Sequence, residues 1–147
     1  MTAQENLADL IYGWDDFDWV QVRPGVRAYA VPVDPRNFPG GAMGLAIDYG
    51  ANQVVPPHYH SVGHLELVLS GTLWVTGRPE PAISLRVVAA GYEYGPIETR
   101  DNPCRVLEIF PEMKAENVTG KFDPEVLAAA GRTEADLWET AARVGLV

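Results

Sequence analysis

All three histidines of this 147-residue chain, His58, His60 and His64, lie within the segment 58–64. Imidazole is the commonest metal-binding side chain in proteins. In an extended segment, the two rings of an H-x-H pair point to the same face. The clustering therefore predicts a transition-metal site here, and a solvated histidine-bearing loop is the alternative.

A carboxylate follows the histidines closely. Glu66 stands two residues after His64, so on one strand both side chains point to the same face. It lies between Leu65 and Leu67, and an inward carboxylate there is costly unless it is paired or metal-bound. Glu66 is thus a candidate fourth ligand, a candidate uncoordinated acid or base, or a residue hydrogen-bonded to another pocket group.

The segment 50–72 resembles the first motif of the cupins, which are small β-barrels that bind a metal through two histidines, a glutamate and a third histidine. The chain matches the H-x-H of His58 and His60 and the closing glycine, Gly71, although the spacer before His58 is longer than usual. Counted from either anchor, His64 occupies the position of the family's glutamate.

The region 91–102 corresponds to the second motif of that family and contains no histidine. Glu98-x3-Asn102 stands where the family has H-x3-N. The resemblance therefore implies that histidine and glutamate have exchanged places. The implied ligand set is His58, His60, His64 and Glu98. The other interpretation of Glu98 is a strand-end acid that faces solvent or pairs with Arg100.

Three imidazoles and a carboxylate suit one divalent transition metal per chain, with Fe(II) expected first. Mn(II), Ni(II), Co(II) and Zn(II) are also possible, because these ligand types do not select among them.

The elements that must position this site are short strands. From about residue 20 to residue 110, apolar and β-branched runs are separated by turn signals such as Asp34-Pro35 and Asn102-Pro103. This spacing predicts an all-β sandwich or barrel instead of alternating βαβ units. It agrees with the cupin-type β-barrel, a double-stranded β-helix or jelly roll, that the resemblance implies.

One domain spanning 1–147 is expected, with a barrel over 20–110. The extension 1–19 should carry a short helix, indicated by the spacing of Leu7, Leu10 and Ile11. The segment 111–147 should form helices packed outside the barrel. One begins at Asp123-Pro124 and another follows the capping-box pattern of Thr133 to Asp136.

The strands around Ser70-Gly71 are predicted to form a hairpin with one inward and one outward face. The inward face carries His64, Glu66, Val68, Leu73 and Val75. The outward face carries Leu65, Leu67, Leu69 and Trp74. So apolar an outer face requires cover by a second sheet, the terminal helices or another subunit. Cupins are commonly dimers, so the resemblance implies a homodimer.

The formal net charge of −9 argues against nucleic acid or an anionic membrane as a partner. No hydrophobic run is long enough to span a bilayer, and the N-terminus lacks the pattern of a secretion signal. The single cysteine, Cys104, cannot form an intramolecular disulfide. These features favour a cytoplasmic location and a small-molecule substrate.

The first functional hypothesis is a non-heme metal oxygenase, dioxygenase-like, that acts on a small enolisable or diol-like molecule chelated at the metal. Glu66 or Glu98, if not a ligand, would serve as the catalytic base. A redox-silent isomerase, lyase or decarboxylase is the closest alternative. A non-catalytic ligand-binding cupin and a purely structural metal site are the others.

Overall fold

The computed structural model describes residues 9–38, 40–114 and 119–143. Most of the secondary structure in these residues is strand. The strands are β1 (Val20–Arg23), β2 (Val26–Pro32), β3 (Met43–Tyr49), β4 (Val54–Val55), β5 (His64–Ser70), β6 (Thr72–Val75), β7 (Arg78–Pro81), β8 (Ser84–Val88), β9 (Ile97–Glu98) and β10 (Cys104–Phe110).

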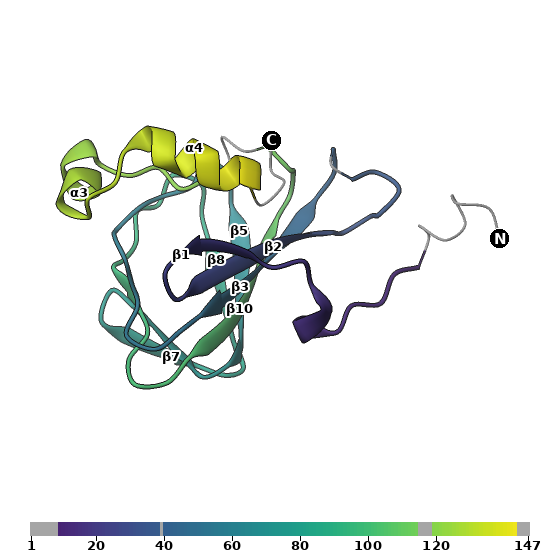
Figure 1. Ribbon diagram of the computed structural model, residues 1–147, viewed down its shortest axis with the longest axis horizontal. Helices are drawn as coiled ribbons and strands as arrows, with labels where there is room; N and C mark the ends of the chain where they lie inside the picture. The colour runs from purple at the N-terminus through teal and green to yellow at the C-terminus, as the bar shows by residue number, and fades with distance from the viewer. Residues whose placement is uncertain (1–8, 39, 115–118, 144–147) are drawn as a thin grey trace.

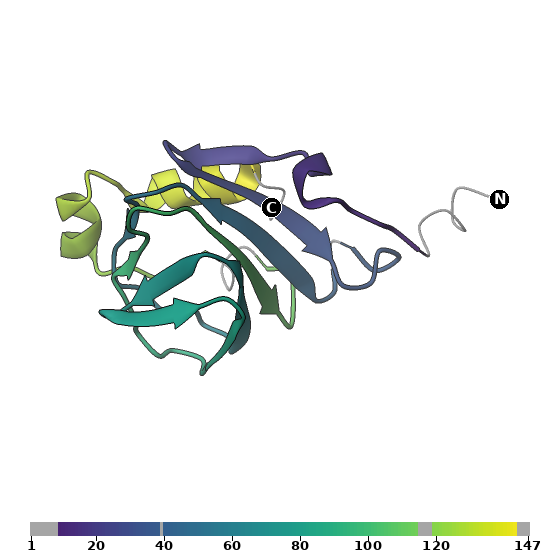
Figure 2. The ribbon, with the colours of Figure 1, turned by 90° about the horizontal axis from the view of Figure 1, so that it is seen from below.

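The strands form two antiparallel sheets with the core between them (Figures 1 and 2). One sheet has the order β1-β2-β3-β10-β5-β8, and the other has the order β4-β9-β6-β7. Along β5, β6 and β10, buried residues alternate with more exposed ones, as expected for strands with one face on a core. Val68, Leu73 and Val106 are fully buried there. The predicted all-β, cupin-type barrel is confirmed.

The hairpin predicted around Ser70-Gly71 is wrong, because the chain passes from one sheet to the other at this point. β5 pairs with β10 and β8, whereas β6 pairs with β7 and β9. Gly71 makes the passage possible. Its φ is +77°, and a Cβ there would collide with the carbonyl oxygen of Pro103. The five residues predicted to face inward are nevertheless all buried.

The N-terminal helix predicted from Leu7, Leu10 and Ile11 is not found in the described part of the segment. Leu7 lies outside the described residues, and neither Leu10 nor Ile11 is helical. A short 3-10 helix spans Trp14–Asp16 instead. The aromatic rings of this region hold it to the sheet, since Phe17 stacks on Tyr29 of β2 with ring centres 5.0 Å apart.

The C-terminal helices form where the caps predict them. α3 (Pro124–Ala129) begins after Asp123, whose carboxylate accepts a hydrogen bond from the Glu125 amide at 2.8 Å. α4 (Glu134–Arg143) begins with reciprocal hydrogen bonds between Thr133 and Asp136. Both helices lie across one end of the strands (Figure 1). Neither they nor any other helix within the described ranges has the length and apolar character needed to cross a membrane.

Candidate metal centre

The three histidines meet inside the molecule. His58 and His60 lie in the loop after β4, and His64 is the first residue of β5. Their exposed fractions are 6%, 5% and 4%. The ring centres of His58 and His60 are 5.2 Å apart, and those of His60 and His64 are 4.8 Å apart. The histidines therefore form a buried cluster, and the alternative of a solvated loop is wrong.

The surroundings keep two of these imidazoles neutral. Burial lowers the pKa of His58 to about 4, and burial with the positive charge of Arg86 lowers the pKa of His64 to about 4. Nδ1 of His58 lies 3.0 Å from the carbonyl oxygen of Pro56. That oxygen can only accept, so Nδ1 carries the proton and Nε2 keeps its lone pair. Metal-binding histidines commonly have this arrangement.

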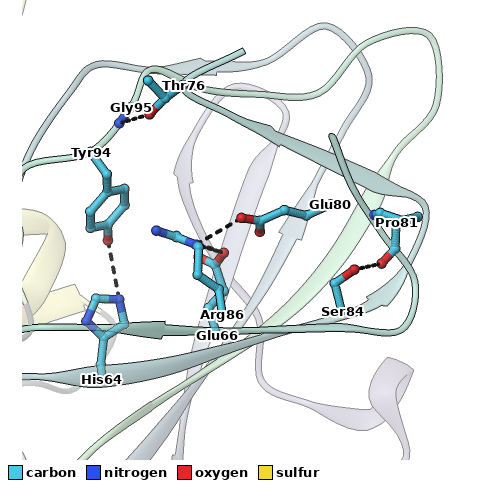
Figure 3. Close-up of polar contacts among 9 residues, drawn as sticks. All are labelled: His64, Glu66, Thr76, Glu80, Pro81, Ser84, Arg86, Tyr94 and Gly95. Carbon is cyan, nitrogen blue, oxygen red and sulfur yellow. Dashed lines mark hydrogen bonds and ion pairs between the residues drawn. The ribbon is translucent and has the colours of Figure 1, made fainter. Parts of the chain in front are cut away.

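Tyr94 packs against the histidine cluster. Its hydroxyl lies 3.3 Å from Nε2 of His64 (Figure 3). Its ring centre lies 4.8 Å from that of His58. Burial raises the pKa of Tyr94 well above its usual range, so the phenol is neutral. Its oxygen can accept a hydrogen bond from Nε2–H of His64, which leaves the lone pair of that ring on Nδ1.

Two phenylalanines and the chain before α3 close the cluster. Phe110 stacks on His64 with ring centres 4.9 Å apart, and Phe122 stacks on His58 at 4.8 Å. Gly120 allows the approach, because a Cβ at this position would lie 2.7 Å from Cδ2 of His58. No local sequence pattern indicates that the segment before α3 reaches a histidine.

The three imidazoles fit a metal ion by their chemical type, their closeness and, for two of them, their neutral charge. Nδ1 of His64 is also buried without a hydrogen-bond partner among the described residues. Within the same residues, however, no group of three or more His, Cys, Asp or Glu side chains is arranged to hold a metal ion. The metal therefore remains a prediction about these histidines.

Glu98 is not brought to the histidines. It lies on β9 between buried Ile97 and Thr99, and it pairs with Val54 and Trp74 on the neighbouring strands. Successive side chains of a strand alternate between its faces, so Glu98 points away from the barrel interior. The exchange of histidine and glutamate implied by the family motif thus has no counterpart in this geometry.

Glu66 points inward as predicted and is only 1% exposed. Its Oε1 accepts hydrogen bonds from Nη2 and Nε of Arg86 at 2.8 and 3.1 Å. Of the three roles proposed from the sequence, the structure supports a carboxylate bound to another pocket group (Figure 3). The guanidinium of Arg86 also lies 4.2 Å from the ring centre of Tyr94, so it connects Glu66 to the side chain that contacts His64.

Two more carboxyl groups surround Arg86. Oε1 of Glu80 lies 3.2 Å from Nε of Arg86, and Glu108 pairs directly with Glu66 across β10 and β5. Burial, the charge of Glu66 and a hydrogen bond to Glu66 raise the pKa of Glu108 well above its usual range. Burial therefore favours the protonated form of Glu108. Sequence reasoning missed Glu80, Arg86 and Glu108.

No protein-family model matches the chain, and no curated protein sequence matches it. Solved structures do resemble it. The polyketide cyclase RemF from Streptomyces resistomycificus gives a TM-score of 0.64 at 18% identity, covering 90% of this chain and 97% of that one. An acetylacetone dioxygenase from Acinetobacter johnsonii gives 0.56 at 13% identity, covering 70% and 73%.

A chain in the structure of Rhodobacter sphaeroides SigE in complex with the anti-sigma ChrR gives a TM-score of 0.56 at 25% identity. The match covers 66% of this chain and half of that one. Other similar structures include a chain described as an RmlC-like cupin from Ralstonia eutropha. Together with the two sheets and their strand order, these likenesses show that the chain has the cupin fold.

Proposed function

We propose that this protein is a metal-dependent cupin enzyme that acts on a small enolisable or diol-like molecule, and that it is an oxygenase of the dioxygenase type. The observation that carries the proposal is the buried cluster of His58, His60 and His64, two of which are held neutral. Neutral imidazoles in a site closed to bulk water favour a transition metal over Mg²⁺ or Ca²⁺.

The three histidines would hold one divalent metal, with Fe(II) expected first. When bound, such an ion would act as a Lewis acid on substrate oxygens and, if redox-active, support oxygen chemistry. Tyr94 would orient the His64 ring through its hydroxyl, which is 3.3 Å from Nε2. Phe110 and Phe122 would keep water from the imidazoles.

Glu66 remains the proposed acid or base, and its contacts limit which of its two oxygens could act. Its Oε1 is engaged by Arg86, while Oε2 is buried and receives no hydrogen bond from a described nitrogen or hydroxyl group. Glu98 has no place in this proposal, because it lies on the outward face of β9.

The test is oxygen uptake by the full chain loaded with Fe(II), measured with acetylacetone and with a small vicinal diol. The proposal predicts oxygen consumption that depends on substrate and is abolished in the His60→Ala variant, with His58→Ala and His64→Ala as parallel variants. Stoichiometric metal binding without oxygen uptake would contradict the oxygenase and leave Lewis-acid chemistry.

Redox-silent chemistry is the second candidate, and it has a specific observation in its favour. The likeness to the polyketide cyclase RemF extends over 90% of this chain, whereas the likeness to the acetylacetone dioxygenase covers 70%. An isomerase, lyase or decarboxylase of this kind would turn over with Zn(II) in the absence of oxygen. A non-catalytic ligand-binding module would bind the same molecules and release them unchanged.

A further inference from the structure

A second cavity lies away from the histidine cluster, between the first strands of the larger sheet and the C-terminal segment. Its volume is about 170 Å³. Most of the wall is apolar and comes from β2, β3 and α4, including Val26, Ala28, Leu45, Ile47 and Leu137. Phe122, which stacks on His58, separates this cavity from the histidines.

Two arginines, Arg23 at the end of β1 and Arg132 before α4, line the same cavity. None of the described residues that line it is acidic, and no described carboxylate forms an ion pair with either arginine. Nη2 of Arg23 is buried without a hydrogen-bond partner, as is Oγ1 of Thr119, which also lines the cavity. Nη2 of Arg132 donates a hydrogen bond to Oγ1 of Thr140 at 3.4 Å. This chain carries 20 acidic against 11 basic residues, so two arginines without a described acidic partner in one cavity stand out.

Their placement is unfavourable for the protein alone. Burial lowers the pKa of Arg23, and the positive charge of Arg132 lowers it further, so the two guanidinium groups repel each other. A buried cation without a partner costs free energy, and buried polar groups in native proteins are almost always satisfied. An anion in the cavity would offset part of this positive charge and could accept hydrogen bonds from the unpartnered Nη2 of Arg23 and Oγ1 of Thr119.

The size of the cavity sets the size of that anion. An apolar cavity of about 150 Å³ is large enough to hold benzene. A volume of about 170 Å³ therefore matches one aromatic ring or a short alkyl chain. The planar fork of an arginine matches a carboxylate better than a point charge does.

We propose that this cavity binds a small carboxylate with an apolar body, such as an arylcarboxylate. Its carboxylate lies against Arg23 and Arg132, and its apolar part lies against Ala28, Leu45 and Ile47. The proposed carboxylate site does not depend on the histidine metal, so it can be tested separately from the proposed oxygenase.

Benzoate is the probe, and benzyl alcohol is its uncharged counterpart of similar size. The full chain, labelled with ¹⁵N and kept in chelator to exclude metal, is titrated with each and followed through its amide resonances. The proposal predicts shifts at Gly120 and Leu137 with a dissociation constant for benzoate of about 1 mM or tighter. Benzyl alcohol should bind at least about tenfold more weakly.

Three variants test which positive charges contribute to benzoate binding. Arg23→Gln and Arg132→Gln should each weaken benzoate binding about tenfold. Arg36→Gln removes the same charge from an exposed arginine and should leave binding unchanged. The melting temperature of ligand-free Arg23→Gln should not fall, because the substitution removes an unpaired cation; a purely structural arginine would lower it.

Absence of benzoate binding, equal binding of benzyl alcohol, or unchanged binding in both arginine variants would each overturn the proposal. If Arg23→Gln fails to fold, Arg132→Gln and the comparison of the two ligands on the natural chain still decide it.

Discussion

Glu66 and Glu108 are directly paired across β5 and β10, and both carboxyl groups are buried beside the single guanidinium of Arg86. Two buried carboxylates cannot both stay ionised at low cost, so the protonated form of Glu108 is favoured. The three residues share one row of the larger sheet, because Arg86 pairs with Glu66 from β8. This row lies next to the row of His64, so the carboxyl group of Glu108 belongs to the wall of the barrel interior.

The Glu108→Gln variant tests that protonation. The folded chain keeps the proton of Glu108 above the pH at which the unfolded chain releases it, about 4.3. The free energy of unfolding of the natural protein should therefore fall as pH rises from this value through the folded-state pKa. Glutamine imitates the protonated carboxyl, so the stability advantage of the variant should grow by up to about 1.4 kcal/mol per pH unit.

Urea denaturation between pH 5 and pH 8 measures this difference. Glu139→Gln is the control, since Glu139 is exposed on α4 and its variant should parallel the natural protein. Parallel curves for Glu108→Gln as well would show that Glu108 is ionised in the folded state.

Tyr94→Phe removes only the hydroxyl that contacts His64 and keeps the ring that packs on His58 and Arg86. The expected loss of stability is about 1 kcal/mol, the net value of one hydrogen bond. Tyr94→Ala also removes the buried ring and should cost about 3 to 5 kcal/mol. Denaturation of both variants checks this order, and a loss as large for Phe as for Ala would place the stabilisation in the hydroxyl.

Glu98→Gln separates the family motif from the observed geometry. Glu98 lies on the outer face of its strand, so the variant should keep the metal affinity of the natural protein within about twofold. Isothermal titration with Zn(II) or Co(II) measures it. A large loss of affinity would restore Glu98 to the ligand set and require β9 to present its other face.

Exposed apolar residues on and beside β8 offer a test of the expected homodimer. Leu85 is 61% exposed and Val87 75% exposed, and Ile83 just before the strand is 79% exposed. So large an apolar surface on an edge strand favours cover by a second copy of the chain. Sedimentation velocity should show a dimer that Val87→Lys converts to monomer, whereas Val54→Lys on the other sheet should leave it intact. A monomeric natural protein would contradict the expectation.

The sequence predicted the fold and the core of the site for clear physical reasons. Period-two alternation assigns His64, Glu66 and Val68 to one face without knowledge of the strand pairing. Local capping residues likewise determine where α3 and α4 begin. The wrong hairpin at Ser70-Gly71 shows the limit, because a tight turn looks the same whether the strands pair or pass to opposite sheets.

The rest of the site depends on contacts between residues distant in sequence. The family spacing Glu98-x3-Asn102 assigns Glu98 to the cluster, whereas the described contacts to His58 and His64 come from Tyr94. Arg86, Glu80 and Glu108 come from three strands and meet only when the register is known. Phe122 reaches His58 from beyond the barrel, and local patterns do not report such a contact.

We expect His58, His60 and His64 to bind one metal ion. Elemental analysis of the full chain, purified without chelator and again after reconstitution with Fe(II), tests it most directly, with His60→Ala as the paired variant. About one transition-metal ion per chain is expected in the natural protein, and almost none in the variant. Equal metal content in the two proteins, or none in the natural protein after reconstitution, would contradict it.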